Sequence, residues 1–122
     1  MSANISYLAV FLGSNTSARR AAWDALPEGE RRAKEAEGMS VWKAWVETHH
    51  AAIVAMGGPL GKTKKVSQHV IDDASNDMCA FTVVRADSHE AAAKLFENHP
   101  HFAIFPGDSV EIMPVLPIPG AS

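Results

Sequence analysis

The chain has 122 residues, of which 47% are hydrophobic and 20% are charged, and its formal net charge is −3. Area scaling gives such a chain a folded surface of roughly 6,400 Å² against roughly 19,000 Å² unfolded, so it can bury a core without disulfides or a structural metal. This composition excludes intrinsic disorder of the whole chain. Lysine and arginine form no run longer than a pair, which argues against a nucleic-acid groove.

The single cysteine, Cys79, cannot form an internal disulfide, which fits a reducing compartment. Its apolar neighbours predict a buried thiol in a strand. The N-terminus has no basic residues, and the apolar stretch at 7–12 is too short for a signal peptide. No window approaches the ~20 apolar residues of a membrane span. We therefore expect a soluble cytoplasmic protein that forms one domain, residues 1–122.

The first half of the chain predicts a strand, a short helix and a long helix. Residues 5–12 are a short apolar run with aromatic and β-branched side chains, which indicates a strand buried on both faces. Residues 18–25 predict a short helix that stops before Pro27, because the residue before a proline disfavours helix. From residue 30 to 56 apolar side chains recur every three or four positions, which predicts one long helix ended by the glycines and proline of 57–59.

The second half predicts a hairpin, a helix and a last strand. Residues 64–72 and 78–85 are its two strands, joined by a polar turn. The next helix begins at Asp87, which stands in a capping-box arrangement, and ends at Pro100. Residues 109–115 alternate as a last strand, and the proline near its end indicates a sheet edge.

The order strand–helix–strand, strand–helix–strand predicts an α+β fold of the ferredoxin-like βαββαβ type. In this arrangement both helices cover one face of a four-stranded sheet, and the other face requires a cover of its own. A second copy of the chain is the simplest cover, so we expect a homodimer.

Two short motifs add a family resemblance to this pattern. They read Gly-Gly-Pro-Leu-Gly-Lys at 57–62 and Asn-His-Pro-His-Phe at 98–102. Together with the opening strand, the hairpin and the final strand, they make the chain similar over most of its length to the YCII-related proteins. The resemblance implies a dimeric α+β barrel built from ferredoxin-like subunits. A catalytic His–Asp pair near the first strand and helix of some relatives does not carry over, because this chain has no histidine between residues 7 and 47.

Three histidines are candidates for chemistry. His49 falls on the apolar stripe of the predicted long helix, either as a hydrogen-bonded core residue or as a general base that lines a cavity between helix and sheet. His99 and His101 flank Pro100, which holds their imidazoles at defined angles. They either anchor a loop, form the wall of a pocket for an organic ligand, or join His49 in a three-histidine metal site. We assign His49 and His99 as candidate catalytic residues and His101 as a candidate ligand-binding residue.

The segment at 57–62 is superficially like a phosphate-binding loop, but it lacks the required spacing and follows a predicted helix. It is either a helix stop with a tight turn, or a pocket rim where backbone N–H groups at Gly58 and the ammonium of Lys62 hold an anion such as a carboxylate. Trp45 is either a core residue or an aromatic wall for a flat ligand. We assign Trp45, Gly58 and Lys62 as candidate ligand-binding residues.

Three functions are compatible with these residues. The first is a small-molecule binding protein or enzyme, with a partly apolar organic ligand, neutral or anionic, between helices and sheet, and with acid–base catalysis by His49 or His99 that needs no cofactor. The second is a non-catalytic dimeric module for binding or scaffolding. The third is a metal-dependent enzyme that uses His49, His99 and His101.

Overall fold

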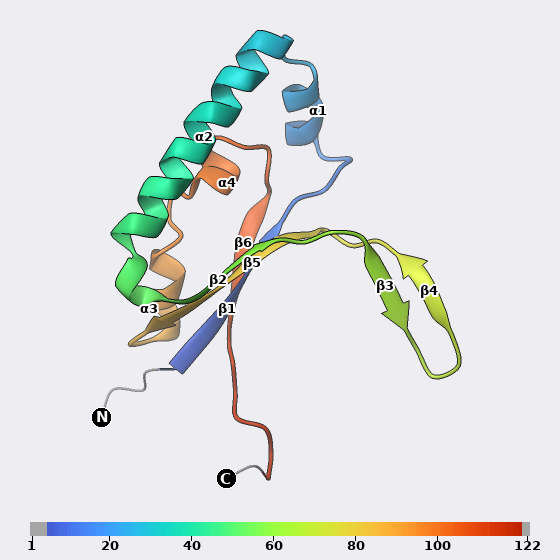
Figure 1. The fold of residues 1–122 in the computed structure, drawn as a ribbon, viewed down its shortest axis with the longest axis vertical. Helices are drawn as coiled ribbons and strands as arrows, with labels where there is room; N and C mark the ends of the chain where they lie inside the picture. The colour runs from blue at the N-terminus through green and yellow to red at the C-terminus, as the bar shows by residue number, and fades with distance from the viewer. Residues whose placement is uncertain (1–4, 121–122) are drawn as a thin grey trace.

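The computed structural model describes residues 5–120. Its elements, in chain order, are β1 (Ile5–Leu12), α1 (Ala18–Asp24), α2 (Glu28–Thr48), the 3-10 turn η1 (His50–Ala52), β2 (Ile53–Pro59), β3 (Thr63–Val66), β4 (Ile71–Ala74), β5 (Met78–Ala86), α3 (His89–Lys94), α4 (Pro100–Ala103) and β6 (Ser109–Pro114) (Figure 1).

The main sheet has four strands in the order β2-β5-β1-β6, and every neighbouring pair is antiparallel. Two helical crossovers, β1–α2–β2 and β5–α3–β6, link its strands, so the ferredoxin-like α+β fold is confirmed. The last strand, β6, lies at the edge of the sheet, as its proline indicates. None of the helices within residues 5–120 is long and apolar enough to cross a membrane.

The helices cover one face of this sheet (Figure 1). Alternate residues of β1, namely Tyr7, Ala9 and Phe11, are buried against Trp45 of α2 and Phe96, which follows α3. Because side chains alternate along a strand, the residues between them point to the opposite face. That second face carries no helix, and Leu8 and Leu12 on it are only half-buried, so the burial of β1 expected on both faces is complete only on the helix-covered face.

The long helix is shorter than its periodicity predicts. α2 ends at Thr48, and Ile53–Pro59 form the edge strand β2 instead of the last helical turns. Ile53 and Met56 fit a helical spacing, but a short apolar run with β-branched residues fits a strand equally well. Met39, which the same stripe places on the buried face, is 63% exposed.

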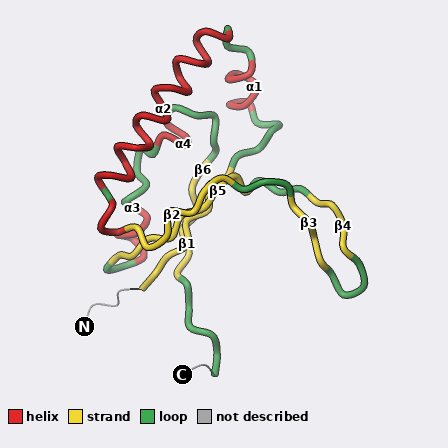
Figure 2. Tube along the Cα trace, in the orientation of Figure 1, coloured by secondary structure: helices red, strands yellow, loops and turns green. Residues whose placement is uncertain are grey.

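The predicted strand at 64–72 is also wrong. β3 and β4 form a separate two-stranded ribbon whose turn covers 67–70, where the Ser67 N–H donates to the Val70 carbonyl. Charges opposite each other hold this register, since Lys64 pairs with Asp73 and Lys65 faces Asp72. The ribbon leaves the main sheet and projects to one side (Figures 1 and 2).

The helix expected from Asp87 to His99 is shorter than predicted: α3 ends at Lys94, and a separate short helix, α4, follows at Pro100–Ala103. Ser88, not Asp87, is the N-cap of α3, and its hydroxyl accepts a hydrogen bond from the Ala91 N–H. Pro100 begins α4 instead of ending a helix, because its fixed φ and missing N–H suit the first helical position. Cys79, expected to be buried, is exposed.

Gly57 lies at an irregularity in the pairing of β2 with β5. Its φ is +66°, and a Cβ added there would overlap the carbonyl oxygen of Phe81 on the neighbouring strand. Gly58 has neither constraint, because a Cβ added there meets no atom within 4 Å. The two adjacent glycines therefore have different structural roles.

We predict that Gly57→Ala destabilises the protein by about 2–4 kcal/mol, through left-handed strain and the displacement of β5. Gly58→Ala, the matched control, should change the free energy of unfolding by less than about 1 kcal/mol. Urea denaturation followed by circular dichroism measures both. Equal losses for the two variants would contradict the role given to Gly57.

Candidate functional site

His99 lies at the centre of an aromatic cluster, with no exposed surface. Its ring centroid lies 5.0 Å from that of Phe11 on β1, 4.5 Å from Trp42 and 4.8 Å from Trp45 on α2. The Phe96 ring lies 5.8 Å away. The imidazole therefore joins the sheet, the long helix and the segment after α3.

His99 is neutral and is the N-cap of α4. Its Nδ1 accepts a hydrogen bond of 3.1 Å from the His101 N–H, so the ring hydrogen is on Nε2. Nε2 is buried and has no hydrogen-bond partner among the described residues. Burial, and to a smaller extent the neighbouring His101 and His49 imidazoles, lowers the pKa of His99 to about 3.

His101 is held to the end of β1. Its Nε2–H donates to the Leu12 carbonyl at 2.8 Å, and the ring lies against Gly107, where an added Cβ would overlap it. Burial lowers the pKa of His101, while the Leu12 hydrogen bond and the Asp108 carboxylate oppose that shift. Both residues of the His-Pro-His motif thus connect α4 to the core.

His49 and Trp45 belong to the same cluster. His49 is the C-cap of α2, its N–H donates to the Trp45 carbonyl, and its half-buried ring lies 5.1 Å from the Trp45 indole. The Trp45 Nε1–H donates to the Leu95 carbonyl at 2.8 Å. The structure therefore brings together His49, His99, His101 and Trp45, and the roles predicted for them stay predictions.

The three histidines do not make a metal-ligand set in this arrangement. His99 Nδ1 and His101 Nε2 are already engaged with the backbone. Within residues 5–120, no group of three or more histidine, cysteine or acidic side chains is arranged to hold a metal ion.

A cavity of about 310 Å³ lies between α2 and the β2–β5 edge of the sheet. Its walls are almost entirely apolar and include no charged side chain; they are formed by Phe11, Met39, Trp42, Met56, Gly57, Gly58, Pro59, Ala80, Phe81 and Thr82. The Thr82 hydroxyl is the polar side-chain group of the wall, and it donates to the Met56 carbonyl at 3.0 Å. Phe11 and Trp42 separate this cavity from His99.

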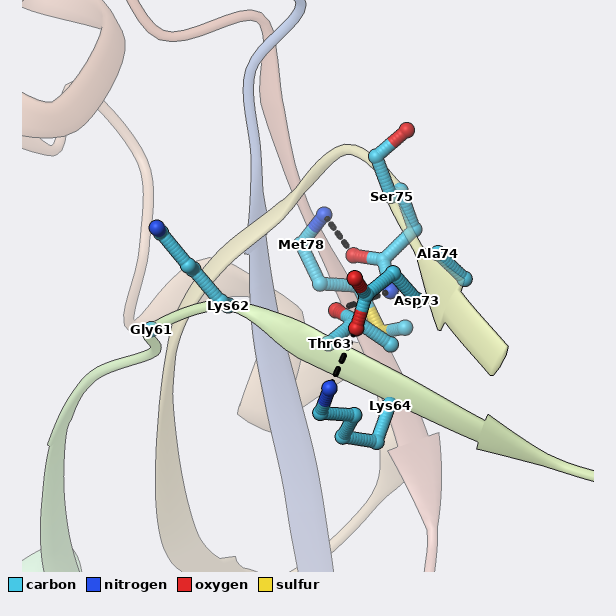
Figure 3. A pocket seen from close by; sticks show the side chains of 9 residues that line it. Gly61, Lys62, Thr63, Lys64, Asp73, Ala74, Ser75 and Met78 are labelled. Atoms are coloured by element: carbon cyan, nitrogen blue, oxygen red, sulfur yellow. Dashed lines mark hydrogen bonds and ion pairs between the residues drawn. The ribbon is translucent and has the colours of Figure 1, made fainter. Parts of the chain in front are cut away.

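Gly58 and Lys62 lie in different places. Gly58 contributes to the apolar cavity, whereas Lys62 lines an open pocket of about 450 Å³ at the base of the β3–β4 ribbon. Figure 3 shows the Lys62 side chain pointing away from the Lys64–Asp73 ion pair. The structure thus does not place the Lys62 ammonium beside the histidines or in the apolar cavity.

Sequence reasoning missed most of the cavity wall. The alternation of Ala80 and Thr82 with Phe81 on β5 is the signal that places them on the helix-covered face. Met39 lies at the exposed margin of the cavity.

No protein-family profile matches the sequence, and no curated protein matches it. Among solved structures, the chain is similar to 5-chloro-2-hydroxyhydroquinone dehydrochlorinase from Burkholderia phenoliruptrix AC1100 in complex with 2,5-dihydroxybenzoquinone. The two chains are 16% identical, the match covers 88% of this chain and 90% of that one, and the TM-score is 0.48. The fold assignment rests on the strand order given above.

We predict that His99 makes the protein sensitive to acid. Because its folded-state pKa of about 3 lies below the ordinary value of 6.5, the unfolded chain binds a proton that the folded chain does not. The contribution of His99 to the free energy of unfolding is therefore fully present above about pH 6.5. It falls toward pH 3 by at most about 1.4 kcal/mol per pH unit.

The variant His99→Asn tests this, because an asparagine oxygen can replace Nδ1 as the cap but does not titrate. Between about pH 4 and pH 6 its unfolding free energy should depend on pH less steeply than that of the wild type, by up to one proton. The difference at about pH 8, where both are neutral, reports packing alone. Parallel pH profiles would contradict a buried neutral His99.

Proposed function

We propose that the chain binds a small, uncharged ring compound in the cavity between α2 and the sheet. The observation that carries the proposal is the concave, apolar wall of this cavity, with an indole and a phenyl ring on one side. Its volume of about 310 Å³ lies at the lower end of the range for small-molecule sites. Cavities of about half that size hold benzene, so one or two rings fit.

The wall chemistry selects against an anion. A carboxylate placed in the cavity would lose its water shell and meet no lysine or arginine among the lining residues. A neutral ring with one hydroxyl or carbonyl group suits the Thr82 hydroxyl, which donates to Met56 and still has a lone pair to accept a hydrogen bond.

The proposal is for binding and does not include a proton-transfer step. His99 has no exposed surface, its Nδ1 is occupied, and a pKa of about 3 makes it a weak base at neutral pH. His49 does not line the cavity, and its ring lies against the Trp45 indole. A non-catalytic binding module is therefore the function that the arrangement supports best.

We also propose that the chain is a member of the YCII-related family and pairs as a homodimer through the helix-free face of the sheet. Leu8, Val83 and Met113 stand side by side on that face in the strand register, and Met113 is 40% exposed. An apolar sheet face of this kind is stable in water when a second layer covers it.

We predict that phenol and indole bind more tightly than benzoate, and that Ala80→Leu weakens binding at least about 10-fold by filling the cavity from β5. Saturation-transfer difference NMR titrations measure these affinities. Met39→Glu, a change at an exposed margin residue, should weaken binding of the same neutral probes without lowering the melting temperature.

Ala44→Leu, an exposed position on α2 outside the cavity, is the matched control and should bind like the wild type. The cavity assignment is wrong if Ala80→Leu is folded and retains wild-type affinity, or if benzoate binds best.

For the pairing, we predict a dimer in sedimentation equilibrium that Val83→Asp converts to a folded monomer, because a carboxylate would then be buried in the interface. A wild-type protein that sediments as a monomer at every concentration would overturn the homodimer.

A further inference from the structure

The β3–β4 ribbon is the part of the fold that packs least against the rest of its own chain. We call residues 60–77 the arm. It forms a sheet of its own and extends beyond the main sheet (Figures 1 and 2). A two-stranded ribbon alone in water is only marginally stable, so an arm of this kind gains from packing against another surface.

Three exposed apolar side chains flank the turn at the end of the arm. Val66 is 72% exposed, Ile71 is 69% exposed and Val70 is 48% exposed. Val66 and Ile71 stand directly opposite each other in the register, so their side chains share one face of the ribbon. The next pair toward the base, Lys65 and Asp72, points to the other face. The arm thus carries a small apolar patch on one side of its end.

The total exposed area shows that a large surface lacks a cover. The chain has an accessible surface of 8493 Å², whereas a compact monomer of 13.1 kDa has roughly 6,400 Å². The excess is about 2,000 Å². A standard interface buries about 800 Å² per partner, and obligate homodimers bury more. The arm, the helix-free sheet face and the extended segment after β6 share this excess, which is larger than the area that each copy buries in a standard dimer.

The arm is long enough to reach across a partner. Seven residues from its base to Val66 span about 23 Å at about 3.3 Å per residue. A four-stranded sheet is about 14 Å wide between its outer strands. An arm that extends past the edge of its own sheet can therefore lie over the sheet of a second copy.

We propose that the arm is a dimer clasp, in which Val66 and Ile71 of each copy pack against the helix-free sheet face of the other copy. This inference rests on the proposed homodimer and adds the element that holds it together. Because a two-fold interface is self-complementary, both arms make the same contact, and the dimer contains two copies of the contact made by Val66 and Ile71.

The double variant Val66→Lys/Ile71→Glu tests the clasp. It keeps an opposite-charge pair across the ribbon but removes the apolar patch. We expect its dimer dissociation constant, from sedimentation velocity over a dilution series, to rise at least about 100-fold. The charge exchange Lys65→Asp/Asp72→Lys, on the other face of the same ribbon, is the matched control and should leave the constant unchanged.

A wild-type dimer whose dissociation constant is the same in the double variant overturns the clasp and leaves the homodimer standing. A monomeric wild type overturns both. If the double variant is misfolded by circular dichroism, a photo-cross-linking residue introduced at Val66 gives a second test. We expect covalent dimers whose cross-link maps by mass spectrometry to β1, β5 or β6 of the other chain, and cross-links confined to one chain overturn the proposal.

Discussion

The buried imidazole of His99 is the contact on which the packing of the helices against the sheet depends. It touches Phe11 of the sheet, both tryptophans of α2 and Phe96 after α3, while its Nδ1 caps the first turn of α4. Only a neutral ring can do both, because a proton on Nδ1 would leave the His101 N–H without an acceptor. The burial that packs the His99 ring against its aromatic neighbours therefore also lowers its pKa.

This constraint also shapes the apolar cavity. Phe11 and Trp42 contact His99 with one side and line the cavity with the other. Because the cluster around His99 holds both rings in place, it also positions the cavity wall. It presents no polar group to a ligand. The most conspicuous polar motif of the sequence, His-Pro-His, therefore supports the site from behind the wall, and the cavity is lined mainly by apolar residues outside that motif.

The topology could be predicted because it depends on the alternation and order of apolar segments, which are clear in residues 5–12, 78–85 and 109–115. The second strand was missed, since Ile53 and Met56 continue the helical spacing of α2 and only the tertiary pairing with β5 decides between helix and strand. The convergence of His49, His99, His101 and Trp45 agrees with helices on one face, but the separation of Lys62 from them does not follow from the sequence. Lys62 lies where the chain has left the main sheet for the β3–β4 ribbon, and no pattern in the sequence marks that departure.

The end of β2 also links the cavity to the arm, two parts of the molecule that remain without a cover. Gly57 and Gly58 lie in the cavity wall, and the chain then continues directly into the arm. A partner that holds the arm in place restrains the end of β2, and hence one side of the cavity. Pairing and ligand binding are for this reason expected to be coupled: by linkage, a ligand that binds the restrained wall more tightly also strengthens the dimer by the same factor.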